Sequence, residues 1–106
     1  VIEAYAYGTS KAAVHHLTRI MAKRLVGENI LVNAIAPGPY ESMMLGAAVN
    51  HDYSFIESRN PRKRIGSPED MAGLVIFLCS RAGAYTVGAI IPSDGGIVGC
   101  AGHDLS

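Results

Sequence analysis

The sequence is poor in charge and in cysteine, and it has no long apolar run. Only 17% of its 106 residues are charged, whereas 49% are hydrophobic. A domain this small has too little interior for so many apolar side chains, so we expect part of its surface to belong against other protein. Nine basic and nine acidic residues give a formal net charge of zero without a basic stripe. Nucleic acid and anionic membranes are therefore not expected as partners.

The few cysteines and the short apolar runs also indicate the compartment in which the protein is found. Cys79 and Cys100 form neither a disulfide framework nor a metal-ligand spacing, which favours a reducing compartment, the cytoplasm. Cys79 ends the apolar run 74–79 and is predicted to be a buried, reduced thiol. The longest apolar run is too short to span a bilayer. No signal peptide opens the chain, and its start at Val1 looks like the middle of a longer protein.

Two helices are predicted from the apolar periodicity. Apolar residues recur at helical spacing from about Tyr7 to Val26 along a broad stripe, and Gly27 is placed to end this helix. A second helix is predicted over 67–80. Ser67 can cap it, Pro68 suits its first position, and two acidic residues follow near the positive end of the helix dipole.

Between and after these helices the sequence predicts two strands and a long insertion. The apolar runs 30–36 and 87–91 are typical of short strands buried in a parallel sheet. Residues 43–65 show no clear period and are predicted to form a substrate-binding loop or lid with short helices of its own. Helix, strand, loop, helix, strand is half of a doubly wound α/β fold. We therefore expect 1–106 to be half of one Rossmann-like domain; the family resemblance given below implies that it is the C-terminal half and that the N-terminal, cofactor-binding half is missing.

Tyr7 and Lys11 stand four residues apart on the first predicted helix, so their side chains project from one face. An ammonium beside a phenol stabilises the phenolate, and such a tyrosine can exchange a proton with a substrate oxygen while a hydride moves. Tyr5 has Thr9 at the same spacing and gains no such partner. A Tyr–Lys pair alone is more often an exposed amphipathic pair than a catalytic one, so the hypothesis needs support from other motifs.

That support comes from motifs that resemble the short-chain dehydrogenase/reductase family, in the family's order. Segment 7–14, Tyr-Gly-Thr-Ser-Lys-Ala-Ala-Val, resembles its active-site helix with the Tyr-x-x-x-Lys signature. Segment 32–38 resembles the strand and Pro-Gly turn near the nicotinamide, and 64–72 matches the Arg-x-Gly-x-Pro-Glu-Asp-x-Ala segment. The Asp-Gly-Gly turn at 94–96 matches the end of the closing strand. The resemblance covers nearly the whole chain and includes the 3-oxoacyl-carrier-protein reductases.

The resemblance implies a role for each matching residue. Tyr7 would be the general acid/base, and Lys11 would hydrogen-bond the nicotinamide ribose. The residues implied in cofactor binding are Tyr7, Lys11, Pro37, Gly38, Tyr40 and Ser42. Those implied in substrate binding are Pro39, Tyr40, Met43 and Met44, although the two methionines could equally pack under the lid. Ser42 replaces the family's usual threonine, and Ser93 stands where a valine often precedes Asp-Gly-Gly.

The resemblance implies an NAD(P)-dependent oxidoreductase that interconverts an alcohol and a carbonyl, on a 3-oxoacyl thioester or a sugar-like ketone. The family's glycine-rich phosphate turn and its catalytic serine would precede the tyrosine and are absent from the sequence. We therefore expect this chain alone to bind NAD or NADP poorly and to be inactive. The family also implies dimers or tetramers formed through the helix from Tyr7 to Val26. Two alternatives stay open: a truncated, non-catalytic module that self-associates, and a full-length pseudoenzyme.

Three further sets of residues have plainer interpretations. Asn33 is expected to tie backbone segments together, and Arg64 either braces the lid or is an ordinary surface arginine. The histidines have no reliable metal-ligand spacing, and no metal site is predicted; they are His15, His16, His51 and His103.

Overall fold

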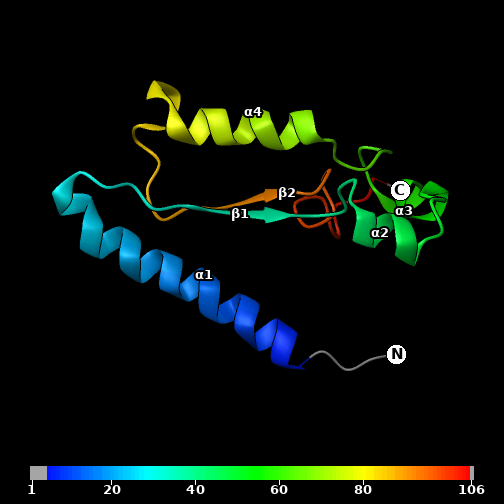
Figure 1. Cartoon of the computed structure of the whole chain (residues 1–106), viewed down its shortest axis with the longest axis horizontal. Coiled ribbons are helices and arrows are strands. Elements are labelled where there is room, and N and C mark those ends of the chain that lie inside the picture. The colour runs from blue at the N-terminus through cyan, green and yellow to red at the C-terminus, as the bar shows by residue number, and fades with distance from the viewer. Residues whose placement is uncertain (1–4, 106) are drawn as a thin grey trace. The chain divides into compact units, whose positions relative to one another are not determined.

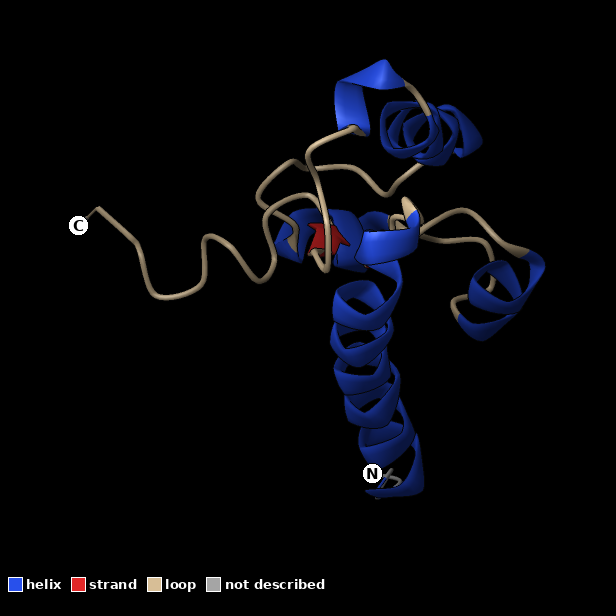
Figure 2. Cartoon of the chain, turned by 90° about the vertical axis from the view of Figure 1, so that its left-hand side faces the viewer, coloured by secondary structure: helices blue, strands red, loops and turns tan. Residues whose placement is uncertain are grey.

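The computed structural model describes residues 5–105, and the elements follow one another as Figure 1 labels them. They are α1 (Tyr5–Leu25), η1 (Val26–Glu28), β1 (Ala34–Pro37), α2 (Met43–Ala48), α3 (Ser54–Arg59), α4 (Pro68–Cys79), η2 (Arg81–Gly83) and β2 (Ile90–Ser93). Most of the regular structure is helical (Figure 2). The chain divides into two compact units, which are described separately. The first holds residues up to Ala34 together with Leu78–Ile91, and the second holds Ile35–Phe77 and the residues from Pro92 onward.

In the first unit, α1 packs through its small residues and leaves its apolar tracks exposed. Thr18 and Ala22 are the buried residues of this helix. A Cβ added to Gly88 would lie 3.4 Å from the Ala22 Cβ, so two small residues allow the helix to approach the backbone at Gly88 closely. Four residues of the apolar stripe that predicts this helix remain at least two-fifths exposed; they are Val14, Leu17, Ile20 and Met21.

The end of α1 differs from the prediction, because Asn29 rather than Gly27 terminates the helical stretch. Asn29 has φ 62°, and its N–H donates to the Val26 carbonyl at 2.9 Å, while the Ile30 N–H donates to the Leu25 carbonyl at 3.3 Å. These two bonds form a Schellman motif, which needs a residue in the left-handed conformation; asparagine tolerates it better than most other non-glycine residues. The chain therefore remains helical past Gly27, through η1.

The two predicted strands form one two-stranded parallel sheet, but both begin later than expected. Within the first unit the Ala34 N–H donates to the Ala89 carbonyl at 2.9 Å, and within the second the Gly38 N–H donates to the Ser93 carbonyl at 3.0 Å. Gly88 has φ 71°, which an extended strand cannot contain, so β2 cannot begin at residue 87. The combination of parallel strands with helices confirms the predicted α/β class.

Proline lies inside each strand, at Pro37 and Pro92, whereas the strands predicted over 30–36 and 87–91 stop one residue before each proline. A proline removes one backbone donor, and a strand tolerates it where that nitrogen faces an unpaired edge. In the part of the chain that the structure describes, each strand has one such edge, because the sheet has only two strands.

Asn33 joins the two strand-bearing segments of the first unit, as expected. Its Nδ2 donates to the Thr86 carbonyl at 2.9 Å, and its Oδ1 accepts from the Ala89 N–H at 2.9 Å. Both ends of the amide are therefore used on a segment more than fifty positions away. The predicted structural role of Asn33 is confirmed.

The second unit contains the segment 43–65, whose expected short helices are α2 and α3. Asn50 and His51 connect them in the left-handed region, with φ 53° and 58°. The helix predicted over 67–80 is α4 (Pro68–Cys79), and its cap differs in detail from the prediction. Asp70 Oδ2 accepts from the Ser67 N–H at 2.9 Å, and the Ser67 hydroxyl donates to the same carboxylate at 3.1 Å. The carboxylate of Asp70 thus caps the first turn.

Helix α4 has no buried residue, and Cys79 is exposed, so the prediction of a buried thiol is wrong. Its apolar residues at helical spacing are Met71, Leu74, Val75 and Leu78; Val75 is exposed and the other three are half-buried. An apolar helix whose faces stay exposed has room for further protein against it. Across residues 5–105, the helices are all too short or too polar to cross a membrane.

Candidate active site

In the first unit, α1 presents Tyr7 and Lys11 side by side. The Lys11 Nζ lies 5.3 Å from the centre of the Tyr7 ring, a cation–π distance. Tyr7 is 66% exposed, and its backbone carbonyl accepts a hydrogen bond from the Ser10 hydroxyl at 2.8 Å. The helical spacing thus places a phenol and an ammonium on one open face, as predicted. A proton carrier next to a cation is an arrangement that can serve acid–base chemistry.

In the second unit, the loop after β1 starts at a glycine with no room for a side chain. A Cβ on Gly38 would lie 2.5 Å from the Asp94 Cβ, so the first turn of this loop passes directly against the end of β2. Further on, Ser42 is the N-cap of α2, and its Oγ accepts from the Leu45 N–H at 3.0 Å. A hydroxyl that accepts one hydrogen bond can still donate its own proton, so Ser42 can cap the helix and contact a ligand.

Tyr40 connects this loop to two other parts of the second unit. It forms a parallel bridge with Gly66, and a Cβ on Gly66 would lie 2.6 Å from the Tyr40 ring, so the ring covers the glycine. The Tyr40 hydroxyl is 2.5 Å from the Ser93 Oγ. Both side chains are half-buried. The serine in place of the family's usual valine therefore has a partner, because this chain also carries a tyrosine hydroxyl at residue 40.

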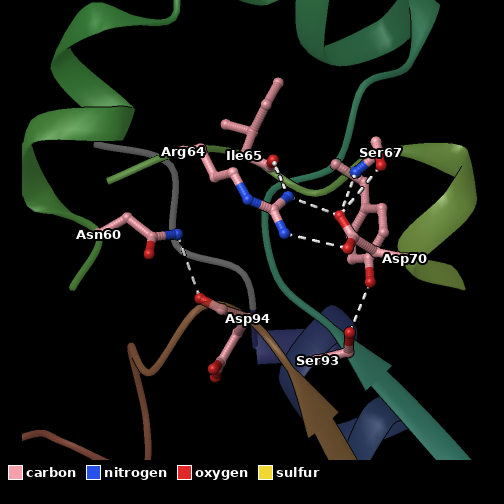
Figure 3. A network of polar contacts seen from close by, with 8 residues as sticks. Asn60, Arg64, Ile65, Ser67, Asp70, Ser93 and Asp94 are labelled. Atoms are coloured by element: carbon pink, nitrogen blue, oxygen red, sulfur yellow. Dashed lines mark hydrogen bonds and ion pairs between the residues drawn. The ribbon is translucent and has the colours of Figure 1, made fainter. Parts of the chain in front are cut away.

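A second contact joins the end of segment 43–65 to the turn after β2 (Figure 3). Asn60 is 2% exposed, and its Nδ2 donates to the Asp94 carbonyl at 3.2 Å. The Asp94 carboxylate organises the turn itself, accepting from the Gly96 N–H at 2.9 Å and the Val98 N–H at 3.1 Å. The turn and the asparagine thus form one hydrogen-bonded unit.

Arg64 and Asp70 form a two-armed ion pair, visible in Figure 3. Nη1 and Nη2 of Arg64 lie 2.6 and 3.0 Å from the two carboxylate oxygens. Hydrogen bonds from Arg64 and then from the Ser67 N–H hold the pKa of Asp70 well below its usual range. The same pair raises the pKa of Arg64. Arg64 therefore joins the end of segment 43–65 to the first turn of α4, which is the bracing role among its two predicted alternatives.

These segments surround an open hollow of about 550 Å³ in the second unit. Its lining includes Pro39, Tyr40, Asn60, Arg62, Arg64 and Asp94. Of the predicted substrate residues, Pro39 and Tyr40 lie at this hollow. Met43 and Met44 project from α2 and are 91% and 85% exposed.

Sequence reasoning did not identify Asn60 as a site residue and treated Ser93 only as a departure from the family pattern. Asn60 lies in a stretch without periodicity, and its one local signal is the following Pro61, which favours an extended residue before it. Asn60 has ψ 125°, in agreement with that preference. Among the residues that the structure describes, no cluster of His, Cys, Asp or Glu could hold a metal ion.

Comparison with known proteins decides the family. Residues 1–98 match the model of a dehydrogenase family described as enoyl-(acyl carrier protein) reductase. The chain belongs to the short-chain dehydrogenase/reductase family. The resemblance noted in the sequence motifs is therefore confirmed, and the family consists of oxidoreductases that use NAD or NADP.

A relative and two solved structures give the scale of the similarity. The chain is 52% identical over 97 residues to the rhamnolipid-biosynthesis 3-oxoacyl-(acyl-carrier-protein) reductase of Pseudomonas aeruginosa, covering 89% of this chain and 38% of that protein. The P. aeruginosa RhlG/NADP active-site complex superposes with a TM-score of 0.81 at 48% identity, covering 92% of this chain and 40% of the other. A putative 2-deoxy-D-gluconate 3-dehydrogenase from Agrobacterium tumefaciens with bound NADP gives 0.78 at 38% identity, covering 88% and 39%.

This short-chain dehydrogenase/reductase chain thus has the fold of one part of a Rossmann domain, as predicted, and it spans about two-fifths of these relatives. In the first unit, the exposed phenol and ammonium of α1 are groups that can hydrogen-bond a substrate oxygen and a ribose. A pyrophosphate is usually bound by a glycine-rich turn that opens a helix. The turns after β1 and β2 read Pro-Gly-Pro and Asp-Gly-Gly and do not have that pattern.

Proposed function

We propose that the protein carrying this chain is an NAD(P)-dependent reductase of 3-oxoacyl thioesters, with Tyr7 as its general acid/base. The observation that carries the proposal is the 52% identity to a 3-oxoacyl reductase over 97 residues. The family match over residues 1–98 includes the Tyr7–Lys11 pair. The open, adjacent placement of these two side chains supports it, since acid–base chemistry needs a hydroxyl that a substrate can reach.

In this proposal each residue of the site has a separate role in the reaction. The nicotinamide, when bound, supplies or accepts the hydride at carbon. Tyr7 gives its hydroxyl proton to the oxygen of the carbonyl during reduction and takes a proton back during alcohol oxidation. Lys11 binds the nicotinamide ribose and stabilises the phenolate left on Tyr7. Pro37, Gly38, Tyr40 and Ser42 orient the nicotinamide through backbone groups and the Ser42 hydroxyl.

Segment 43–65 faces the substrate in this proposal. Met43 and Met44 are unbranched, adaptable side chains that suit an acyl chain, and their high exposure leaves them free to contact one. Pro39 and Tyr40 lie at the adjoining hollow. In this proposal these residues contact the substrate's chain, and Tyr7 exchanges a proton with the oxygen of its reacting carbonyl.

A sugar-like ketone is the second candidate substrate, favoured by the structural similarity to a putative 2-deoxy-D-gluconate 3-dehydrogenase. The polar lining of the hollow, with Arg62, Arg64 and Asp94, suits hydroxyl groups better than an acyl chain. An assay of the full-length protein separates the two. Consumption of NADPH or NADH with a 3-oxoacyl thioester, faster than with a ketogluconate, supports the first candidate. The reverse order supports the second, and no consumption with either contradicts both.

Cofactor choice, assembly and location are proposals as well. The two solved relatives described above contain NADP, and we propose NADP first and NAD second. A homodimer or homotetramer through α1 would cover its exposed apolar tracks, and we propose a cytoplasmic enzyme. This chain alone would lack the phosphate-binding turn and be inactive. A protein that shows assembly but no turnover in the assay above would instead be the non-catalytic module.

A further inference from the structure

Segment 43–65 begins and ends at the same place in the second unit. Tyr40 and Gly66 form a parallel bridge. The Gly66 N–H donates to the Pro39 carbonyl at 2.8 Å, and the Glu41 N–H donates to the Gly66 carbonyl at 3.0 Å. The segment is therefore a closed loop, because backbone hydrogen bonds join the residues just before it to the residue just after it. We call the two ends of this loop its N-terminal and C-terminal roots.

Each root is also attached either to the last residue of β2 or to the turn that follows it. At the N-terminal root, the Gly38 N–H donates to the Ser93 carbonyl at 3.0 Å, and the Tyr40 and Ser93 hydroxyls are hydrogen-bonded. At the C-terminal root, the Arg62 N–H donates to the Gly95 carbonyl at 3.0 Å, next to the contact between Asn60 and Asp94. Residues 93–95, which are the end of β2 and the start of the turn after it, thus hold both ends of the loop.

Asn60 is the side chain that makes the C-terminal attachment specific. It is the largest fully buried side chain in the described part of the molecule. Its Nδ2 donates to the Asp94 carbonyl, and its Oδ1 accepts from the Arg62 N–H at 2.8 Å, so both ends of the amide are satisfied. A Cβ on Gly95 would collide with this amide. Asn60 and Gly95, far apart in sequence, thus pack closely against each other. A buried amide whose oxygen and nitrogen are both hydrogen-bonded is held in one orientation.

We propose that Asn60 is a positioning residue, which holds the C-terminal root of segment 43–65 on the turn 94–95 and so sets where that segment meets the substrate. The proposal rests on the proposed function, in which segment 43–65 faces the substrate. Asn60 is only 2% exposed, so it offers almost no surface to a substrate or cofactor. Loss of its attachment would loosen the C-terminal root, and the substrate would have to order the segment on binding. Substrate affinity would fall, while chemistry on bound substrate would change little.

The first experiment measures hydrogen–deuterium exchange in the full-length protein and needs no activity. Asn60→Asp is close in shape and keeps the oxygen that accepts from Arg62, but it loses the donor and places a carboxylate against the Asp94 carbonyl. Asn50→Asp is the matched control, because it introduces the same charge in the same segment at an exposed residue. Asn60→Asp should speed exchange about tenfold in both 54–64 and 93–97. Asn50→Asp should leave 93–97 unchanged.

The second experiment measures steady-state kinetics and cofactor affinity on the same variants. Asn60→Asp should raise the KM for the carbonyl substrate about tenfold. The kcat and the Kd for the reduced cofactor should stay within about twofold, because a KM effect alone marks lost binding. Asn50→Asp should match the wild type. If Asn60→Asp fails to fold, Asn60→Ser, a smaller polar residue, takes its place in both experiments with the same expectations.

Each outcome decides the proposal. Exchange that is unchanged, or faster in only one of the two segments, overturns the attachment. Faster exchange in both segments with an unchanged KM overturns the positioning role. If the wild-type protein turns over neither candidate substrate, the proposed function has failed, and the exchange result still decides whether Asn60 holds the loop.

Discussion

The proposed catalytic pair in the first unit and the loop attachment in the second unit are built in opposite ways. Tyr7 and Lys11 carry the chemistry, yet they are exposed, and the contacts that define their pairing lie within a single helix. Asn60 carries no chemistry, yet it is buried and joined to a turn 34 positions away. The residues with reactive groups are therefore placed by local helix geometry, whereas the residues that shape the substrate side are placed by contacts across the unit.

This difference predicts two kinds of mutational effect. A change at an exposed reactive group should abolish turnover and leave stability intact, because the group is largely exposed. A change in the attached loop should lower stability or substrate affinity through displaced neighbours. The four predictions below test this contrast from the largest expected effect to the smallest.

The largest effect is expected for Tyr7→Phe in the full-length protein. Removing the hydroxyl removes the proton donor, and general acid–base catalysis contributes about 10²- to 10⁴-fold. We expect kcat to fall at least 10²-fold, with an unchanged urea unfolding midpoint, since Tyr7 is exposed. Tyr5→Phe, in the same helical turn and also exposed, should keep the wild-type rate. A Tyr7→Phe enzyme with normal turnover would remove this residue from the mechanism.

Gly95→Ala should produce the largest loss of stability among changes in the loop attachment. Gly95 has φ 70°, and its new Cβ would collide with the Asn60 amide, so strain and overpacking together should cost about 2–5 kcal/mol. Urea unfolding measures the loss. Gly99→Ala is the control, because a Cβ there meets no atom within 4 Å, and its effect should stay within about 0.5 kcal/mol. Equal effects at both glycines would contradict the close fit of Asn60 and Gly95.

The Tyr40–Ser93 hydrogen bond should contribute about 1 kcal/mol. Tyr40→Phe and Ser93→Val each leave one hydroxyl without its partner, so each single variant should lose about that amount. The double variant leaves no orphaned group, so it should lose clearly less than the sum of the two. A double-mutant cycle of unfolding free energies measures this coupling. Strict additivity would show that the two hydroxyls do not interact in solution.

The smallest effect concerns pH and the Arg64–Asp70 pair. Arg64 and the Ser67 N–H lower the pKa of folded Asp70 below its unfolded value. The folded state therefore binds fewer protons, so the stabilisation is complete above the ordinary aspartate pKa of about 3.9 and is lost as the pH falls below it. Urea midpoints at about pH 7 and about pH 3 should differ less in Asp70→Asn than in the wild type. Glu69→Gln, which leaves the ion pair in place, should keep the wild-type difference.

Local signals in the sequence determined much of this protein. The spacing of Tyr7 and Lys11 sufficed to put them on one face, because an α-helix brings residues four apart together whatever surrounds it. The same local rules predicted α4 from its proline and acidic start and the short helices inside 43–65. The family, too, follows from motifs in order along the chain.

Only the tertiary structure decided which side chains hold the second unit together and where each element ends. Asn60 meets Asp94, and Tyr40 meets Ser93, across 34 and 53 positions of chain, and no local pattern encodes such a pair. The apolar periodicity also did not predict the buried side of α1, which consists of Thr18 and Ala22. Ala22 lies against Gly88, where a small side chain permits a close approach. Helical spacing depends on the backbone alone, whereas a buried hydrogen bond depends on what the rest of the fold brings to it.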